Sequence, residues 1–182
     1  LTPDRVRSLF PTILEILGPD RVLEFHCHSN NGMAPLNVIE AVNCGVRHVH
    51  VATPPLASGS SQPSVYNVVE NLRLSGYTDR LDLDAIDPAR DFLHQVAEDQ
   101  NFALGTPAEY DLNLYQHQIP GGMISNLRYQ LQRVGLEHRV SETLIEAGRV
   151  RADFGYPIMV TPLSQFVGTQ AAINVITGER YK

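Results

Sequence analysis

The sequence predicts an α/β fold in its first part and a mostly α-helical second part. Up to about residue 80, stretches with helical spacing of apolar residues alternate with two short strand-like stretches. From about residue 81, only helical stretches follow. Helix–strand alternation is typical of a parallel sheet, but two strands are too few to be buried on both faces. We therefore expect residues 1–80 to be part of a larger barrel or sheet.

The first helix is predicted to begin at Thr2-Pro3, because threonine at the N-cap and proline in the first turn are typical of helix starts. It is expected to end near Gly18, and Pro11 is expected to kink or split it. A strand is predicted over residues 21–28. The period of two in a strand separates two faces: Glu24, His26 and His28 on one, and Leu23, Phe25 and Cys27 on the other.

A second helix is predicted from Ala34-Pro35 to about Asn43, where Gly45 stops it. A second strand follows over residues 46–53, and a loop over residues 58–63 leads into a third helix that ends at Gly76. In the second half, helices are predicted at four starts: Asp87-Pro88, Gly121-Gly122, Ser141 and the residues after Thr161-Pro162. The expected domains are residues 1–80 and residues 81–182.

Composition excludes several classes of protein. The net charge of -6 and the scattered Lys and Arg residues provide no basic surface for nucleic acid. The sequence has no long apolar run and no signal-peptide layout at its start, so we expect a cytoplasmic protein without a membrane span. Cys27 and Cys44 are expected to be reduced thiols.

A His-x-His pair, His26 and His28, ends the first predicted strand. On a strand the two imidazoles point the same way, roughly 6–7 Å apart along the chain, so they can bind one metal ion such as Zn, Mn or Co. The pair lies at the carboxyl end of its strand, where parallel α/β barrels place their chemistry. His48 and His50 repeat the spacing but lie earlier in their strand, and a packing or hydrogen-bonding role is favoured for them.

Two histidines leave a metal ion short of ligands, and no Asp or Glu in the sequence is placed to supply the third. Glu24 is on the same face but deeper, and a buried, hydrogen-bonded carboxylate is at least as good an interpretation for it. Pro120-Gly121-Gly122 is either an anion-binding helix start or a tight turn. Thr161 is either a helix N-cap or a proton shuttle, and from the residues alone both interpretations stay open.

Four stretches together resemble the carboxyltransferase component of biotin-dependent enzymes, in the group of the oxaloacetate decarboxylase α chain and the corresponding pyruvate carboxylase subunit. They are FHCHSNNG, ATPPLASGSSQPSV, YQHQIPGGMISNLRYQL and VRADFGYPIMVTPLSQFVGTQAAINVITGERYK, and the resemblance covers essentially the whole chain. It implies the C-terminal part of a TIM (β/α)8 barrel followed by a helical carboxylase domain. The implied activity is metal-dependent transfer of a carboxyl group between carboxybiotin and pyruvate or oxaloacetate.

The resemblance also implies roles for individual residues. His26 and His28 match the family's two histidine ligands, whose partners are an Asp and a carbamylated Lys. Thr161 matches the hydroxyl that passes a proton between biotin and the enolate, and Ser164 lies near the biotin. Because the family's Lys precedes a Leu-Thr-Pro helix start, the Asp and the Lys are expected upstream of Leu1, and the 182 residues alone are expected to be inactive.

Two departures from the family's pattern affect these expectations. The family commonly continues its His-x-His with Asp-Thr-Ala/Ser-Gly, whereas Ser29, Asn30 and Asn31 stand here, which removes a carboxylate beside the metal. The sequence has no Met-Lys-Met biotin attachment site, so biotin is expected on another domain or chain. The expected partners are thus a biotinylated carrier, the upstream half of the barrel and further copies of the chain in a homo-oligomer.

Two alternatives stay open at this stage. One is a related His-x-His barrel, a lyase or synthase acting on acyl-CoA, which is not expected to carry the PGGMISNL and VTPLSQFVGTQA stretches. The other is a non-catalytic module that uses the helical domain for assembly, against which tight stoichiometric metal binding would argue.

Overall fold

The computed structural model describes residues 1–182, with the side chains of all of them except Asn113. The chain divides into two compact units, Leu1–Asp111 and Leu112–Lys182. This spatial division lies later in the chain than the expected domain boundary between residues 80 and 81, and where the functional domains divide stays a prediction. Among the described helices, none has the length and apolar character needed to cross a membrane.

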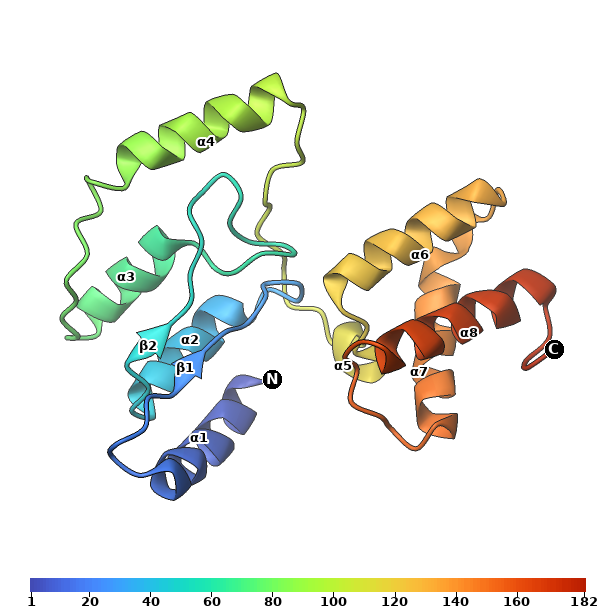
Figure 1. Ribbon diagram of the computed structural model, residues 1–182, viewed down its shortest axis with the longest axis horizontal. Coiled ribbons are helices and arrows are strands. Elements are labelled where there is room, and N and C mark those ends of the chain that lie inside the picture. The colour runs from blue at the N-terminus through green and yellow to red at the C-terminus, as the bar shows by residue number, and fades with distance from the viewer. The chain divides into compact units, whose positions relative to one another are not determined.

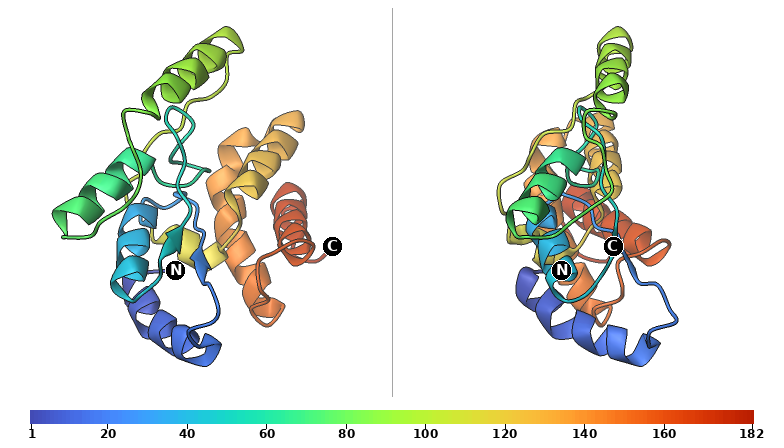
Figure 2. Two further views of the ribbon diagram at one scale, coloured as in Figure 1. Left: turned by 60° about the vertical axis from the view of Figure 1, so that its left-hand side comes forward. Right: turned by 90° about the vertical axis from the view of Figure 1, so that its left-hand side faces the viewer.

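The first unit has the predicted alternation of helices and strands (Figure 1). Its elements are α1 Pro3–Leu17, β1 Glu24–Phe25, α2 Ala34–Asn43, β2 His48–Val49, α3 Val65–Leu74 and α4 Asp87–Asp99. The two strands pair in parallel, with Glu24 opposite His48 and Phe25 opposite Val49. Helix α2 packs against both α1 and α3, which Figures 1 and 2 show from different sides.

The helix starts at Pro3, Ala34 and Asp87 are confirmed, and Thr2 and Gly18 flank α1 as expected. Both strands are shorter than predicted, because the described residues pair β1 and β2 only with each other. Pro11, which was expected to kink or split the first helix, does not split it. Pro11 lies inside a continuous α1 with its ring exposed, so it removes one backbone hydrogen bond without disturbing the packed face.

Apolar residues from α1, β1, α2, α3 and the turn before β2 form the core of the first unit. They are Val6, Phe10, Phe25, Val38, Ala41, Val46 and Val68. The ring of Phe10 meets that of Phe25 edge to face, with centroids 5.2 Å apart. Leu23 and Cys27 pack against the same cluster. The predicted apolar face of the first strand is thus confirmed, and it leaves the neighbouring histidines on the opposite side.

After α4, residues 104–111 run back over the loops that follow β1 and β2. The backbone N–H of Gly105 donates to Pro55 O at 2.7 Å, and that of Asp111 donates to Asn31 O at 3.2 Å. A Cβ on Gly105 would lie 1.8 Å from Ala57 O, and one on Gly32, whose φ is +77°, would lie 2.2 Å from Ala108 O. Only glycine permits these two close approaches of backbone to backbone.

The second unit is helical, as expected for this half of the chain. Its elements are α5 Asn113–His117, α6 Gly121–Arg133, a 3-10 helix η1 Glu137–Arg139, α7 Val140–Asp153 and α8 Leu163–Thr177. Its buried cluster consists of Ile119, Leu127, Ala147, Val150, Met159, Val167, Ala171 and Ala172. Helix α8 packs on α7 and α6 (Figure 1), and small residues on α8, such as Gly168, let α6 approach closely.

The C-terminal segment, residues 178–182, is tied to α7 by a polar network. Arg180 donates from Nε to Glu146 Oε1 at 2.7 Å and from Nη2 to Asp153 Oδ2 at 2.5 Å. The Tyr181 hydroxyl also donates to Asp153 Oδ2, and Asn174 Nδ2 donates to Glu146 Oε1 at 2.8 Å. Burial by itself would raise the pKa of the Glu146 carboxyl, but the hydrogen bonds from Arg180 and Asn174 outweigh it and lower this pKa.

Candidate metal site

His26 and His28 lie just past the carboxyl end of β1, with both side chains exposed. Their Nε2 atoms are 3.2 Å apart. Two imidazoles bound to one tetrahedral ion at the usual Zn–N distance would have nitrogens about 3.3–3.4 Å apart. The pair therefore has the separation that a shared metal ion requires. This is the arrangement predicted from the His-x-His spacing.

The other nitrogen of each ring has a polar partner. His28 Nδ1 lies 2.5 Å from Ser60 O, and because a carbonyl only accepts, this Nδ1 carries the hydrogen. In the neutral ring, Nε2 of His28 then carries no hydrogen, and its lone pair is available to bind a metal ion. His26 Nδ1 lies 2.9 Å from His50 Nδ1. Partners of this kind on the outer nitrogen orient the histidine ligands of metal sites.

Gln62 approaches the same point from the loop after β2. Its Nε2 lies 3.3 Å from His26 Nε2 and 3.4 Å from His28 Nε2. An amide NH2 group donates, so each imidazole can accept from it only in the tautomer whose Nε2 carries no hydrogen. The candidate metal ligands are thus the two Nε2 atoms, which lie close enough together to bind one ion. Imidazole nitrogen is a suitable ligand for Zn, Mn or Co.

Sequence reasoning did not identify Ser60 or Gln62, because the loop over residues 58–63 has no motif for metal binding. The available signal was topological: this loop follows the second strand, and the carboxyl ends of neighbouring parallel strands share one edge of the sheet. The hydrogen bond from Ser29 N to Ser61 O, 2.8 Å long, joins the two loops there.

The structure corrects the interpretation of Glu24 as a buried carboxylate. Its side chain is 59% exposed, and Oε2 lies 3.4 Å from His50 Nε2. The expected hydrogen-bonding role holds for His50, through its contact with His26. Among the described residues, no group of three His, Cys, Asp or Glu side chains is close enough to hold a metal ion.

The residues predicted to handle biotin and the proton lie in the second unit. Thr161 is exposed before α8, and Pro162 is the N-cap residue of this helix, so the N-cap interpretation of Thr161 was wrong. Ser164 is 1% exposed, and its Oγ has no hydrogen-bond partner among the described residues. Contact between this hydroxyl and a ligand would require neighbouring side chains to move. Pro120 serves as the N-cap residue of α6.

The sequence predicted a parallel strand pair with His26 and His28 side by side just past the first strand, followed by a helical unit, and the structure has this arrangement. Residues 114–182 match the family described as "Conserved carboxylase domain", and this match begins close to the start of the second unit. The chain is related to the carboxyltransferase components of biotin-dependent enzymes, as the four stretches predicted.

Particular relatives make this relationship specific. A pyruvate carboxylase subunit of Methanocaldococcus jannaschii is 39% identical over 161 residues, which cover 88% of this chain and 28% of the relative. The methylmalonyl-CoA carboxyltransferase 5S subunit of Propionibacterium freudenreichii subsp. shermanii is 34% identical, with 98% of this chain and 35% of the relative covered. The 2-oxoglutarate carboxylase large subunit of Hydrogenobacter thermophilus is 34% identical over 182 residues, 100% of this chain and 28% of the relative.

Among solved structures, the carboxyl transferase domain from Rhizobium etli pyruvate carboxylase is similar to this chain. The TM-score is 0.88 at 28% sequence identity, covering 98% of this chain and 30% of that one. The chain therefore spans about a third or less of the length of these relatives.

Proposed function

We propose that this chain forms part of a biotin-dependent carboxyltransferase that moves a carboxyl group between carboxybiotin and a 2-oxo acid. The observation that carries the proposal is the convergence of His26 and His28, whose Nε2 atoms are 3.2 Å apart beside the loop that supplies Gln62. The family relationship supports the same assignment. Pyruvate or oxaloacetate is the proposed substrate. 2-Oxoglutarate is a further candidate substrate, because a carboxylase named for it matches the whole chain.

In this proposal, His26 and His28 hold a divalent metal ion through Nε2. The ion would act there as a Lewis acid that polarises the keto oxygen of the substrate. Ser60 holds the His28 ring by its carbonyl, and the amide of Gln62, which lies 3.4 Å from His28 Nε2, is proposed to donate a hydrogen bond to a substrate oxygen. Ser29 stands where the family's carboxylate follows the His-x-His pair, so the charge around a bound ion would be less negative here.

Thr161 is proposed to carry the proton. Moving a carboxyl group from the biotin nitrogen to the methyl carbon of pyruvate requires a proton to move in the opposite direction. A hydroxyl both accepts and donates a proton, and Thr161 is exposed at the start of α8. Biotin itself is proposed to arrive on another domain or chain.

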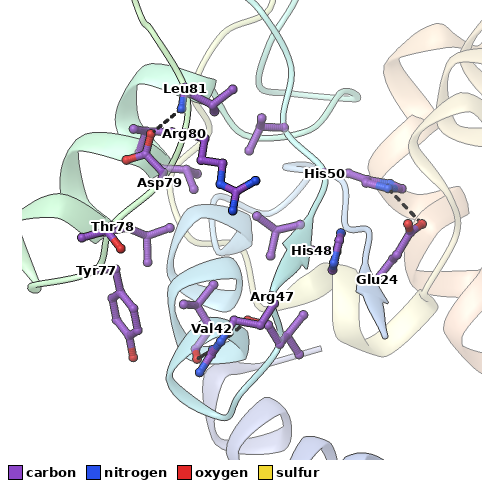
Figure 3. Close-up of a pocket in the computed structure, with 16 residues that line it drawn as sticks. Glu24, Val42, Arg47, His48, His50, Tyr77, Thr78, Asp79, Arg80 and Leu81 are labelled. Atoms are coloured by element: carbon purple, nitrogen blue, oxygen red, sulfur yellow. Dashed lines mark hydrogen bonds and ion pairs between the residues drawn. The ribbon is translucent and has the colours of Figure 1, made fainter. Parts of the chain in front are cut away.

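The remaining metal ligands are proposed to come from outside residues 1–182, on further strands of a barrel. The edge of β2 supports this. The consecutive residues 47–51 line a cavity of about 410 Å³ together with side chains of α2, α3 and residues 77–81 (Figure 3). Side chains of consecutive strand residues point to opposite faces, so a cavity lined by all of them lies along the edge of the strand. We propose that an additional parallel strand lies along this edge.

Metal binding by the purified chain tests the site. Zn2+ is titrated into wild type, His26→Ala and His28→Ala, with imidazole resonances followed by NMR. We expect wild type to bind Zn2+ through both histidines and each variant to lose this binding. His94→Ala, which removes an exposed histidine of α4, is the control and should bind like wild type. Equal binding by all four proteins would refute the site.

Carboxyl transfer tests Thr161. In the complete enzyme with its biotinylated partner, Thr161→Ala should lower kcat for pyruvate carboxylation by about 10²–10⁴-fold, the usual contribution of a positioned acid or base. Thr161→Ser keeps the hydroxyl and should retain most of the activity.

We expect the 182-residue chain alone, given free biotin and Zn2+, not to decarboxylate oxaloacetate. Parallel assays with 2-oxoglutarate identify the substrate.

A further inference from the structure

His50 lies against the outer side of the His26 ring. The two Nδ1 atoms are 2.9 Å apart, and the rings meet edge to face with centroids 5.2 Å apart. The sheet fixes this approach, because the backbone N–H of His50 donates to Phe25 O at 2.9 Å, next to His26 in the chain. His50 therefore reaches His26 from the neighbouring strand at a position set by backbone pairing.

Glu24 lies on the far side of the His50 ring, and Figure 3 shows the contact as a dashed line. Its Oε2 is 3.4 Å from His50 Nε2. A carboxylate only accepts hydrogen bonds, so it favours the His50 tautomer with hydrogen on Nε2. In that neutral tautomer, Nδ1 of His50 is an acceptor and takes the hydrogen from His26 Nδ1. His26 is then left with an unprotonated Nε2, the nitrogen that faces His28.

The geometry points to His50, oriented by Glu24, as a positioning residue that fixes the tautomer and ring orientation of His26 for metal binding. The inference rests on the metal site proposed above and assigns a role to two residues outside the ligand pair. It parallels the hydrogen bond from His28 Nδ1 to Ser60 O, so that each candidate ligand has its own partner.

The chain offers a matched control in His48. This residue has the same side-chain type, is exposed, and lies in β2, two residues before His50, which directly follows that strand. His48 lines the cavity along the edge of β2, and Figure 3 shows its ring apart from the contact between His50 and Glu24. Both Glu24 and His50 have side chains about half exposed, 59% and 47%, so their replacement should leave the fold intact.

The tautomer of His26 is the first measurement, made on the metal-free chain labelled with 15N at histidine. Long-range 1H–15N NMR should find hydrogen on Nδ1 and none on Nε2 of His26 in wild type and in His48→Ala. In His50→Ala this preference should be lost. His50→Gln places an amide oxygen where it can accept from His26 Nδ1 and should restore the preference at least in part. A structural role alone would not change which nitrogen carries hydrogen.

Zn2+ affinity is the second measurement, by competition with a chromophoric chelator. Removing an outer partner of a metal-bound histidine typically weakens binding by 10–100-fold, and we expect a loss of this size in His50→Ala, a smaller one in Glu24→Gln and none in His48→Ala. Unchanged tautomer and affinity in His50→Ala would overturn the inference. If wild type binds no Zn2+, the proposed metal site fails, and the tautomer measurement still decides whether His50 orients His26.

Discussion

Cys27 stands between the two candidate ligands in the sequence yet lies in different surroundings. Its side chain packs against the apolar cluster of the first unit, with Sγ 3.8 Å from Ala34 O. Burial raises the pKa of this thiol to about 11. At neutral pH the sulfur is therefore protonated, and a thiol does not compete with the imidazoles for a metal ion.

This environment predicts slow alkylation of Cys27. At pH 8, iodoacetamide should modify Cys27 in the folded chain far more slowly than in the chain unfolded in urea, because only the thiolate reacts. Peptide mass spectrometry over a time course measures the rate at this site. Modification of folded and unfolded chain at the same rate would contradict the raised pKa.

At the scale of single residues, spacing predicted that His26 and His28 lie together but not which residues contact them. His26 and His28 follow from the period of a strand, which fixes the direction of side chains within one segment. The two histidines are contacted by residues at the end of the second strand and in the loop after it, namely His50, Ser60 and Gln62. No local sequence pattern encodes which of these residues points toward the histidines. The prediction of a buried Glu24 was wrong because the burial of this side chain depends on which other strands cover its face of the sheet.

Among the elements, the extended segment 104–111 connects the site to the rest of the first unit. It holds the loop after β1 through Asn31 and the loop after β2 through Pro55. These loops include the residues around the histidine pair, since Ser60 contacts His28. The close approach at Gly105 is therefore expected to matter for both stability and metal binding.

Gly105→Ala tests this expectation. The new Cβ would meet the backbone of Ala57, and backbone moves less easily than the end of a side chain. We expect the free energy of unfolding to fall by about 1–3 kcal/mol, measured by urea denaturation, together with weaker Zn2+ binding. Gly122→Ala is the matched control, because its Cβ would meet no atom within 4 Å. Equal stabilities of the two variants would show that the segment adapts freely.

The C-terminal segment makes a second prediction at this scale. The folded-state pKa of Glu146 is lowered, and that of Asp153 is lowered by hydrogen bonds from Tyr181 and Arg180. Such groups stabilise the fold above their unfolded pKa, and this stabilisation is lost as the pH falls through the folded pKa. Without Arg180, the loss should begin at higher pH.

Arg180→Ala should therefore shift acid unfolding of the chain to higher pH and lower its stability at pH 7. Circular dichroism across a pH series measures the shift. Lys182→Ala removes a neighbouring cation that pairs with Glu179 at the surface, and it should leave the acid transition in place. A transition at the same pH in Arg180→Ala and wild type would rule out the proposed role of the network.

Most helices were predictable because their starts carry proline, glycine or capping residues next to periodic apolar positions. The short α5 and η1 were not, since a few residues carry no measurable period. The strands were predicted too long for a different reason. A strand is defined by hydrogen bonds to its neighbours, and in residues 1–182 those neighbours are limited to β1 and β2.

Over the whole chain, each compact unit has its own apolar cluster. The cluster of the first unit uses residues 6–68, and that of the second uses residues 119–172. The sequence predicted the change from α/β to helical structure, but compactness depends on contacts between distant residues. This is why the spatial division falls between Asp111 and Leu112.

We expect residues 112–182 to fold without the first unit. Expressed alone, this segment should be helical by circular dichroism and should unfold cooperatively on heating, because its buried cluster and its C-terminal network lie wholly within it. The same segment carrying Leu127→Ala, which opens a cavity in that cluster, serves as the comparison and should melt at a lower temperature. A gradual loss of helix with no transition in the unaltered segment would argue against independent folding.

The edge of β2 also affects how the chain behaves in solution. A strand edge that is not paired with a further strand is a template on which another extended chain adds. Purified without a segment to cover that edge, residues 1–182 are expected to aggregate through intermolecular strand pairing as their concentration rises.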